Sequence, residues 1–231
     1  MYLSDRDLIK AIKRGKLIVD PKPKEADIGA TSIDLHLDSV DQARIWDVEG
    51  YAQENRAAGR NPAELHIGKF DFRKFSPKYT MRPPQYDPSK APNPQQSVFC
   101  RGAQIIVKPG GFLLWITKES IGTPEKKASL ICFVDGKSTR ARTGLLVHMT
   151  APTIHAKWSG QITLEIANLG PFDFVLEEGD VIAQITVAQI SSYPLSKRST
   201  SPATHGQRTV LGGAVSDADL KTTPVRKRRK R

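Results

Sequence analysis

The sequence predicts a mainly β fold with an N-terminal helix and short additional helices. Three observations support this fold class. Short apolar runs recur between turn residues across residues 104–190, two segments alternate apolar and polar residues, and helical spacing is clear only near the N-terminus. Spaced strands with few helices are typical of an all-β barrel or sandwich, and the spacing alone does not separate the two.

Residues 3–17, LSDRDLIKAIKRGKL, are expected to form the N-terminal helix. Ser4 is a suitable N-cap, and Asp5 and Asp7 complement the positive end of the helix dipole. Apolar residues then recur at helical spacing. Gly15 suits the end of the helix because glycine readily adopts the left-handed conformation found there.

The next segment, TSIDLHLDSV at residues 31–40, alternates strictly. Ile33, Leu35 and Leu37 share one face, and polar side chains share the other. This two-residue period predicts a strand with one buried face.

Residues 41–97 follow no clear period and include the proline-rich run RPPQYDPSKAPNPQQ. They are predicted to be an insertion of loops with a few short strands. We therefore expect one domain at residues 1–191 that carries this insertion. Residues 192–231 are rich in Pro, Ser, Thr and Gly at their start and form a separate C-terminal segment.

Several further runs are predicted to be strands that are divided by turns. They lie at residues 104–121 (strand, PGG turn, strand), 128–134, 143–151, 160–170 and 180–190.

The net charge of +11 is concentrated at the C-terminus. Residues 221–231 carry seven cations and no acid, and subtracting these seven from +11 leaves +4. Such a tail can contact nucleic acid nonspecifically or can simply increase solubility, and its composition does not decide between these roles.

The composition points to a soluble, cytoplasmic protein. No apolar run reaches the length of a membrane span, and the charged N-terminus does not resemble a signal peptide. Cys100 and Cys132 lie in apolar stretches without a CxxC partner, so two buried thiols are expected, with a disulfide left open.

Glu165 is the most notable candidate for chemistry. In the run GQITLEIANLG it lies on the strand face opposite Ile162, Leu164 and Ile166. An acid in an apolar strand indicates either a solvated face or an acid–base group with a shifted pKa. The pattern alone favours the solvated face.

The preceding turn offers His155, Lys157, Trp158 and Ser159. A loop histidine is more often solvated than functional, and a loop tryptophan more often packs than stacks on a ligand. His148 is expected to lie within a strand as a core histidine with satisfied hydrogen bonds.

The stretch DGKSTRARTG at residues 135–144 is a polar turn between two apolar runs. Its cations and hydroxyls give it the potential to bind an anion. The sequence lacks a phosphate-binding P-loop, a GxSxG elbow and the HxE and PCxxC motifs of zinc deaminases. Its scattered histidines and cysteines form no convincing zinc set.

The linear order of these motifs resembles the dCTP deaminase family of the dUTPase-like superfamily. The resemblance rests on SDRDLIKAI, TSIDLHLDS, DGKSTRARTGLLVHMTA, IHAKWSGQITLEIANLG and LEEGDVIAQITV. It is strong over residues 135–187, fair over the first forty residues and over 105–121, and poor over 41–97 and the C-terminus. The combination of GKS-x3-R-x-GL-x-VH-x-TA with WSG-x4-LE makes it specific.

The resemblance implies a distorted β-barrel that associates as a homotrimer, with active sites between subunits. The implied reaction is hydrolytic deamination of dCTP, or of a modified dCTP, to dUTP and ammonia without zinc. Glu165 matches the general base that takes a proton from the attacking water. Ser138 and Arg142 match residues that position this water and support the glutamate, and the backbone of Ala151 lies beside the base.

The resemblance also implies nucleotide-binding positions. Lys137, which replaces the usual Arg, and Thr139 match phosphate-binding residues. Ser138 is also among the nucleotide-binding positions, and Mg²⁺ accompanies the triphosphate without a protein ligand. His155 and Trp158 lie in the motif that contacts the deoxyribose, and Gln207 matches the glutamine of a C-terminal lid.

Two departures from the family pattern affect these implications. His155 stands where the family has an Asp, which argues against the alternative function of a dUTPase-like pyrophosphatase. In the lid, Ala203 stands where the family has a Lys, and the Tyr is absent in register. A noncatalytic nucleotide-binding or nucleic-acid-binding protein on the same fold is a further alternative.

Overall fold

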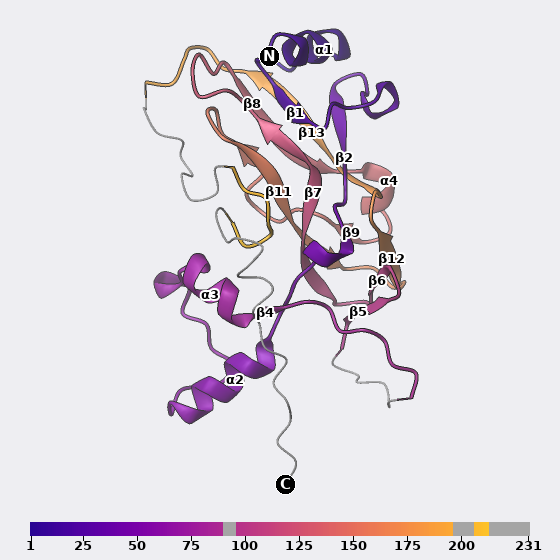
Figure 1. Ribbon diagram of the computed structural model, residues 1–231, viewed down its shortest axis with the longest axis vertical. Coiled ribbons are helices and arrows are strands. Elements are labelled where there is room, and N and C mark those ends of the chain that lie inside the picture. Colours follow the sequence, from indigo (N-terminus) through magenta and orange to yellow (C-terminus); the bar gives the residue numbers. More distant parts are fainter. Residues whose placement is uncertain (90–95, 196–205, 213–231) are drawn as a thin grey trace.

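The structure, a computed structural model, describes residues 1–89, 96–195 and 206–212 (Figure 1). Its helices are α1 (Asp5–Lys13), α2 (Val48–Ala57), α3 (Phe72–Tyr79) and α4 (Ser138–Ala141), with short 3-10 turns at Glu25–Asp27, Val40–Gln42 and Ile67–Lys69. Its strands are β1 (Ile18–Asp20), β2 (Ser32–His36), β3 (Ile45–Trp46), β4 (Thr80–Met81), β5 (Val98–Arg101), β6 (Gln104–Val107), β7 (Phe112–Gly122), β8 (Leu130–Gly136), β9 (Leu145–Leu146), β10 (Thr153–Ile154), β11 (Ser159–Asn168), β12 (Phe174–Glu177) and β13 (Val181–Gln189).

The strands form four antiparallel sheets. Two have four strands each, in the orders β1-β7-β11-β9 and β10-β8-β13-β2, and smaller sheets have the orders β12-β6-β5 and β3-β4. The mainly β class with few helices is confirmed. The expected barrel is not seen as a closed sheet among the described residues. The sheets are joined by isolated bridges, such as that of Leu37 with Thr117, and not by continuous ladders of hydrogen bonds.

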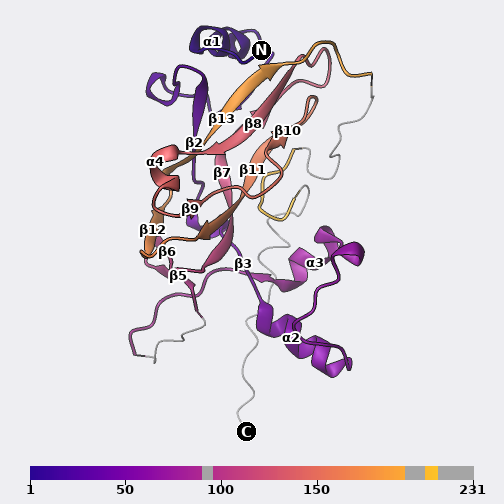
Figure 2. The same ribbon diagram turned by 180° about the vertical axis from the view of Figure 1, so that it is seen from behind.

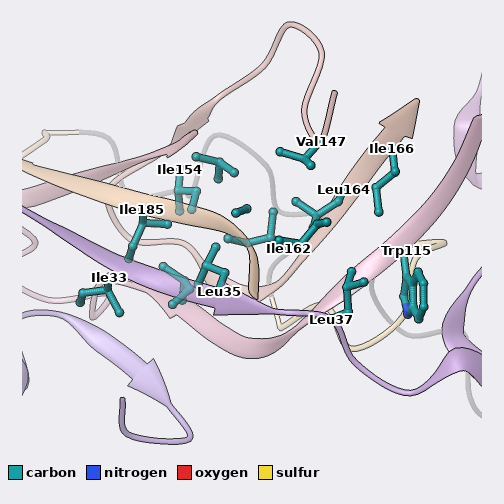
Figure 3. Close-up of a cluster of buried hydrophobic side chains, with 14 of the residues drawn as sticks. Ile33, Leu35, Leu37, Trp115, Val147, Ile154, Ile162, Leu164, Ile166 and Ile185 are labelled. Atoms are coloured by element: carbon teal, nitrogen blue, oxygen red, sulfur yellow. The ribbon is translucent and has the colours of Figure 1, made fainter. Parts of the chain in front are cut away.

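The two four-stranded sheets share one hydrophobic core (Figure 3). The predicted alternation of β2 is confirmed, since Ile33, Leu35 and Leu37 are fully buried. Leu164 and Ile166 of β11 are equally buried and belong to the same cluster. Burying each of these side chains contributes about 1.5–3 kcal/mol, so the face of β11 opposite Glu165 is firmly held.

Helix α1 forms where the sequence predicts it, and Leu8 is its most deeply buried residue. Ser4 occupies the N-cap position as predicted, but its side chain makes no capping hydrogen bond. Gly15 ends the helix with a φ of 64°, as expected. No helix in the described part of the chain is long and apolar enough to cross a membrane.

The prediction for residues 41–97 was wrong in one respect: the described part contains two helices, α2 and α3, as well as short strands. Asp47 and Asp71 cap these helices by accepting hydrogen bonds from the backbone N–H groups of Gly50 and Arg73. The helices lie together beyond one end of the large sheets (Figures 1 and 2). We call residues 45–81 the helical insertion.

Both cysteines are buried free thiols, so the disulfide left open by the sequence does not form between them. Burial raises the pKa of Cys132 to about 12. The pKa of Cys100 is raised for the same reason.

Candidate active site

A cavity of about 240 Å³ lies against β8, β10 and β11. Figure 2 shows these three strands near one another, with the yellow segment 206–212 beside β11. Several of the residues expected at a site line this cavity, namely Ala151, His155, Trp158, Glu165 and Gln207. The structure thus gathers residues that are more than fifty positions apart in the sequence.

Glu165 reaches the cavity because of the alternation of β11. Leu164 and Ile166 point into the core, so Thr163 and Glu165 share the opposite face, which lines the cavity. The Glu165 side chain is 32% exposed. Its surroundings are therefore neither an open solvated surface nor a dry core.

His148 lies beside Glu165, with 3.0 Å between His148 Nδ1 and Glu165 Oε2. The pairing of β9 with β11 explains this, because Leu145 is opposite Asn168 and Leu146 is opposite Ala167. The same register, continued by two residues, brings His148 level with Glu165.

The electrostatics of this pair are unusual. Glu165 raises the pKa of His148, and this effect exceeds the opposing effect of burial. Both ring nitrogens of His148 and Oε2 of Glu165 are buried without a hydrogen bond of good geometry to any described residue. The close atoms form an ion pair when His148 is protonated, and their orientation leaves hydrogen-bonding capacity for a ligand or water.

The place of His148 beside Glu165 was not predicted from the sequence. A core histidine with satisfied hydrogen bonds in a strand was expected, whereas His148 lies just after β9 and its ring nitrogens lack such partners. The sequence signal for His148 was its place in the VH-x-TA part of the motif that carries the resemblance. Strand register, which a single sequence does not give, was needed to pair it with Glu165.

Gln161 fixes the part of the site where β11 begins. Its side-chain amide donates to Asp38 Oδ2 and to the Thr117 carbonyl, both at 2.8 Å. A β-bulge between Gln161 and Thr163 lets the Ile162 N–H bond the Thr117 hydroxyl at 2.9 Å. These contacts hold the cavity face of β11 in one orientation.

Residues 206–212 run along β11 and bring Gln207 into the cavity. The Gly206 N–H donates to the Ser159 carbonyl at 2.7 Å, and the Gln161 N–H donates to the Gln207 carbonyl at 2.9 Å. The Gln207 side chain donates to the Thr163 hydroxyl and is 5% exposed. A Cβ at Gly160 would lie 2.8 Å from the Gln207 nitrogen, so glycine is needed for this approach.

A second group of expected site residues lies away from this cavity. Ser138 and Thr139 begin α4, and Arg142 directly follows it. All three are exposed and line none of the cavity, and their side chains make no hydrogen bond within the described residues. Lys137, just before them, places Nζ 2.6 Å from Asp34 Oδ1.

The arrangement around Glu165 is suited to proton transfer. A half-buried carboxylate beside an imidazole of raised pKa can accept a proton from water and pass it on. Among the described residues, one carboxylate lines the cavity, and no group of three or more His, Cys, Asp or Glu side chains could hold a metal ion. The expectation of zinc-free chemistry stays a prediction.

Comparisons with known proteins agree with the motifs. A family model described as dCTP deaminase-like matches residues 2–190. A dCTP deaminase from Marinomonas sp. (strain MWYL1) is 29% identical over 222 residues, which are 94% of this chain and 98% of that protein. A dCTP deaminase from Thermomicrobium roseum is 32% identical over 193 residues, covering 83% of this chain and 81% of that protein.

A solved structure also resembles this fold. The crystal structure of 2'-deoxycytidine 5'-triphosphate deaminase from Agrobacterium tumefaciens matches with a TM-score of 0.52 and 17% identity. The match covers 82% of this chain and 48% of that chain, so this chain spans about half of the length of its structural relative. At this identity the likeness shows a shared fold alone.

Proposed function

The chain belongs to the dCTP deaminase-like family, and from that premise we propose that it deaminates a deoxycytidine nucleotide, dCTP or a modified dCTP. The reaction consumes one water and releases ammonia and the corresponding uracil nucleotide. The observation that carries this proposal is the half-buried Glu165 beside His148 in the cavity. The cytoplasmic location expected from the sequence belongs to the same proposal.

Glu165 is proposed as the general base. It removes a proton from the water that attacks C4 of cytosine, and it delivers protons to N3 and to the departing amino group. Because Oε2 lies beside His148, Oε1 is the oxygen left for water. The carbon–nitrogen bond at C4 then breaks, and ammonia leaves.

Magnesium is expected to accompany the triphosphate. The described lining of the cavity offers one carboxylate, which is paired with His148, so the protein does not supply a set of Mg²⁺ ligands there. The ion would be held by the phosphates, and no step of the proposed reaction passes through it.

We propose that the complete site forms between subunits of a homotrimer. Ser138 and Arg142 are expected to support the catalytic water, yet they do not line the cavity of their own chain. Their exposure on and after α4 leaves them available to a neighbouring copy. Thr139 and Lys137 would reach the phosphates from the same turn, and Lys137 would then exchange Asp34 for a phosphate.

Residues 206–212 are proposed as the inner part of a lid over the nucleotide. Gln207 is already in contact with β11, which supports the role expected for it. Ala203, where the family has a Lys, and the basic tail at residues 221–231 lie outside the described residues. The nonspecific nucleic-acid contact proposed for that tail therefore stays a prediction.

A nucleotide panel with parallel detection of ammonia and pyrophosphate tests the proposed function. Ammonia from dCTP, or from a modified dCTP, without pyrophosphate is the expected result. Pyrophosphate from dUTP would instead favour the pyrophosphatase alternative, against which His155 in the cavity argues. Nucleotide binding with no product would favour the noncatalytic alternative.

A further inference from the structure

The helical insertion contains a second cavity, of about 400 Å³, between α2, α3 and the segment that joins them. This volume lies within the range of small-molecule sites. The described residues that line it are all different from those that line the Glu165 cavity. It is a separate place in the fold.

Aromatic rings form one side of this second cavity. Tyr51, Phe70, Phe75 and Tyr79 line it, and all four are only partly buried. Their ring centroids are 5.1–5.3 Å apart for Tyr51 with Phe75, Tyr51 with Tyr79, and Phe70 with Phe75. Aromatic surface that remains open in a cavity is suited to a planar ring, such as a nucleobase.

Cations outnumber anions around the same cavity. Of its carboxylates, Glu54 lies 2.6 Å from Lys78 Nζ, and Asp71 lies 3.6 Å from Lys74 Nζ. Arg60 and Lys69 make no side-chain hydrogen bond or ion pair within the described part of the chain. Lys69 is therefore left for an anionic group, and Arg60, which also helps to lower the pKa of Glu54, can join it.

Asn55 supplies a polar group at the wall of the cavity. It is 4% exposed, and its side-chain amide makes no hydrogen bond to any residue that the structure describes. Its polar atoms are not among the described buried atoms that lack a partner, so the amide keeps contact with the open cavity and is available to a ligand there. An asparagine amide can both donate to and accept from a base edge, and it matches adenine N6 and N7 especially well.

We propose that the helical insertion binds a purine nucleotide in this second cavity. The base lies against the aromatic rings and pairs with Asn55, and the phosphates contact Arg60 and Lys69. The site is additional to the one proposed for the substrate.

A packed path connects the second cavity with the first. The rings of Phe75 and Trp46 have centroids 5.6 Å apart, and Trp46 packs against a cluster that contains Val210 and Leu211. These two residues belong to the segment that carries Gln207 into the first cavity. A nucleotide in the second cavity would therefore lie at one end of a row of packed side chains that reaches the lid segment.

Isothermal titration calorimetry of the full chain with ATP tests the proposal. ATP is expected to bind, and the Arg60→Glu/Lys69→Glu double variant is expected to bind it at least tenfold more weakly. Arg73→Glu, which reverses an exposed cation of α3 outside the cavity, is the matched control and should bind like the wild type. Absence of ATP binding, or equal binding by the double variant, would overturn the proposal.

Inorganic triphosphate separates recognition of the base from recognition of the phosphates. Asn55→Leu should weaken ATP binding severalfold while leaving triphosphate binding unchanged, and circular dichroism checks that the variant is folded. Wild-type protein that binds triphosphate as tightly as ATP would reduce the site to an anion site and would also overturn the proposal.

A further titration separates this proposal from the proposed function. ATP is added to Glu165→Gln protein that is saturated with dCTP, and undiminished ATP binding is expected. Displacement of dCTP by ATP would place ATP in the first cavity and would contradict the proposed site in the second cavity. Because calorimetry needs no turnover, a protein that fails to deaminate dCTP still reports on the second site.

Discussion

Oε2 of Glu165 lies 3.0 Å from Nδ1 of His148, although the two residues are seventeen positions apart in the sequence. At this distance Glu165 raises the pKa of the His148 imidazole. Both residues line the cavity described above. Ala151, His155, Trp158 and Gln207, which the sequence also predicted as site residues, line the same cavity.

Replacing Glu165 with Gln should remove the general base while keeping the shape of the side chain. We expect kcat for dCTP to fall by about 10²–10⁴-fold, with little change in dCTP affinity. Ammonia release and calorimetric binding measure the two quantities. Glu49→Gln, which alters an exposed glutamate of α2, is the control; a Glu165→Gln enzyme as fast as this control would refute the assigned role.

The raised pKa of His148 makes stability depend on pH. Protonated His148 favours the folded state, so its contribution is fully present below the ordinary histidine pKa of about 6.5 and is lost as the pH rises through the raised pKa. His148→Gln should therefore be most destabilising near pH 5.5 and progressively less so towards pH 9. Urea unfolding of both proteins across this range measures the difference, and a difference that grows with pH would contradict the ion pair.

Lys137 can be tested as a phosphate ligand despite its contact with Asp34. Lys137→Met should raise KM for dCTP about tenfold, which corresponds to losing one charge-assisted contact. The effect should be smaller for dCMP, which has fewer phosphates. Lys137→Arg keeps the charge and should stay close to the wild type, while an equal effect of Lys137→Met on both nucleotides would argue for a purely structural role.

Gly160→Ala should push residues 206–212 away from β11, because the new Cβ would lie 2.8 Å from the Gln207 nitrogen. Hydrogen exchange at Gly206 and Gln161, whose N–H groups make the bonds between the two segments, should become faster. KM for dCTP should rise as Gln207 leaves the cavity. Gly68→Ala, where an added Cβ meets nothing within 4 Å, is the control.

Sites between subunits predict complementation. Glu165→Gln and Arg142→Ala proteins should each be inactive, yet a mixture that has exchanged subunits should regain activity, because some sites combine an intact Glu165 with an intact Arg142 from the neighbour. For random exchange about a quarter of the sites are intact in both residues. If both residues act within one chain, the mixture stays inactive.

Strands and their buried faces were predictable because their signal is local. The alternation at residues 31–40 and 160–170 fixes which side chains are buried, and the structure agrees. The same alternation placed Glu165 away from the core. What it could not show is that this face is covered by His148 and Gln207, since strand register and the path of the C-terminal segment depend on distant contacts.

The helices of the insertion were missed for a different reason. Phe72, Phe75 and Tyr79 have helical spacing, but Pro77 within the same stretch argues against a helix. Ring contacts of Phe75 with Phe70 and Tyr79, and of Phe72 with Trp46, outweigh that local preference. Asp47 and Asp71, which are suitable N-cap residues, are the local sequence signals that mark where these helices begin.

The two buried thiols have a practical consequence for spectroscopy. Cys132, with a pKa of about 12, stays protonated at neutral pH, and Cys100 is 5% exposed with a raised pKa. Maleimide reagents attack thiolates, so a single cysteine introduced on the surface should be labelled selectively in the folded native background. Dyes or spin labels on α3 and on residues 206–212 could then follow movement between the insertion and the lid segment without first replacing a residue of the core.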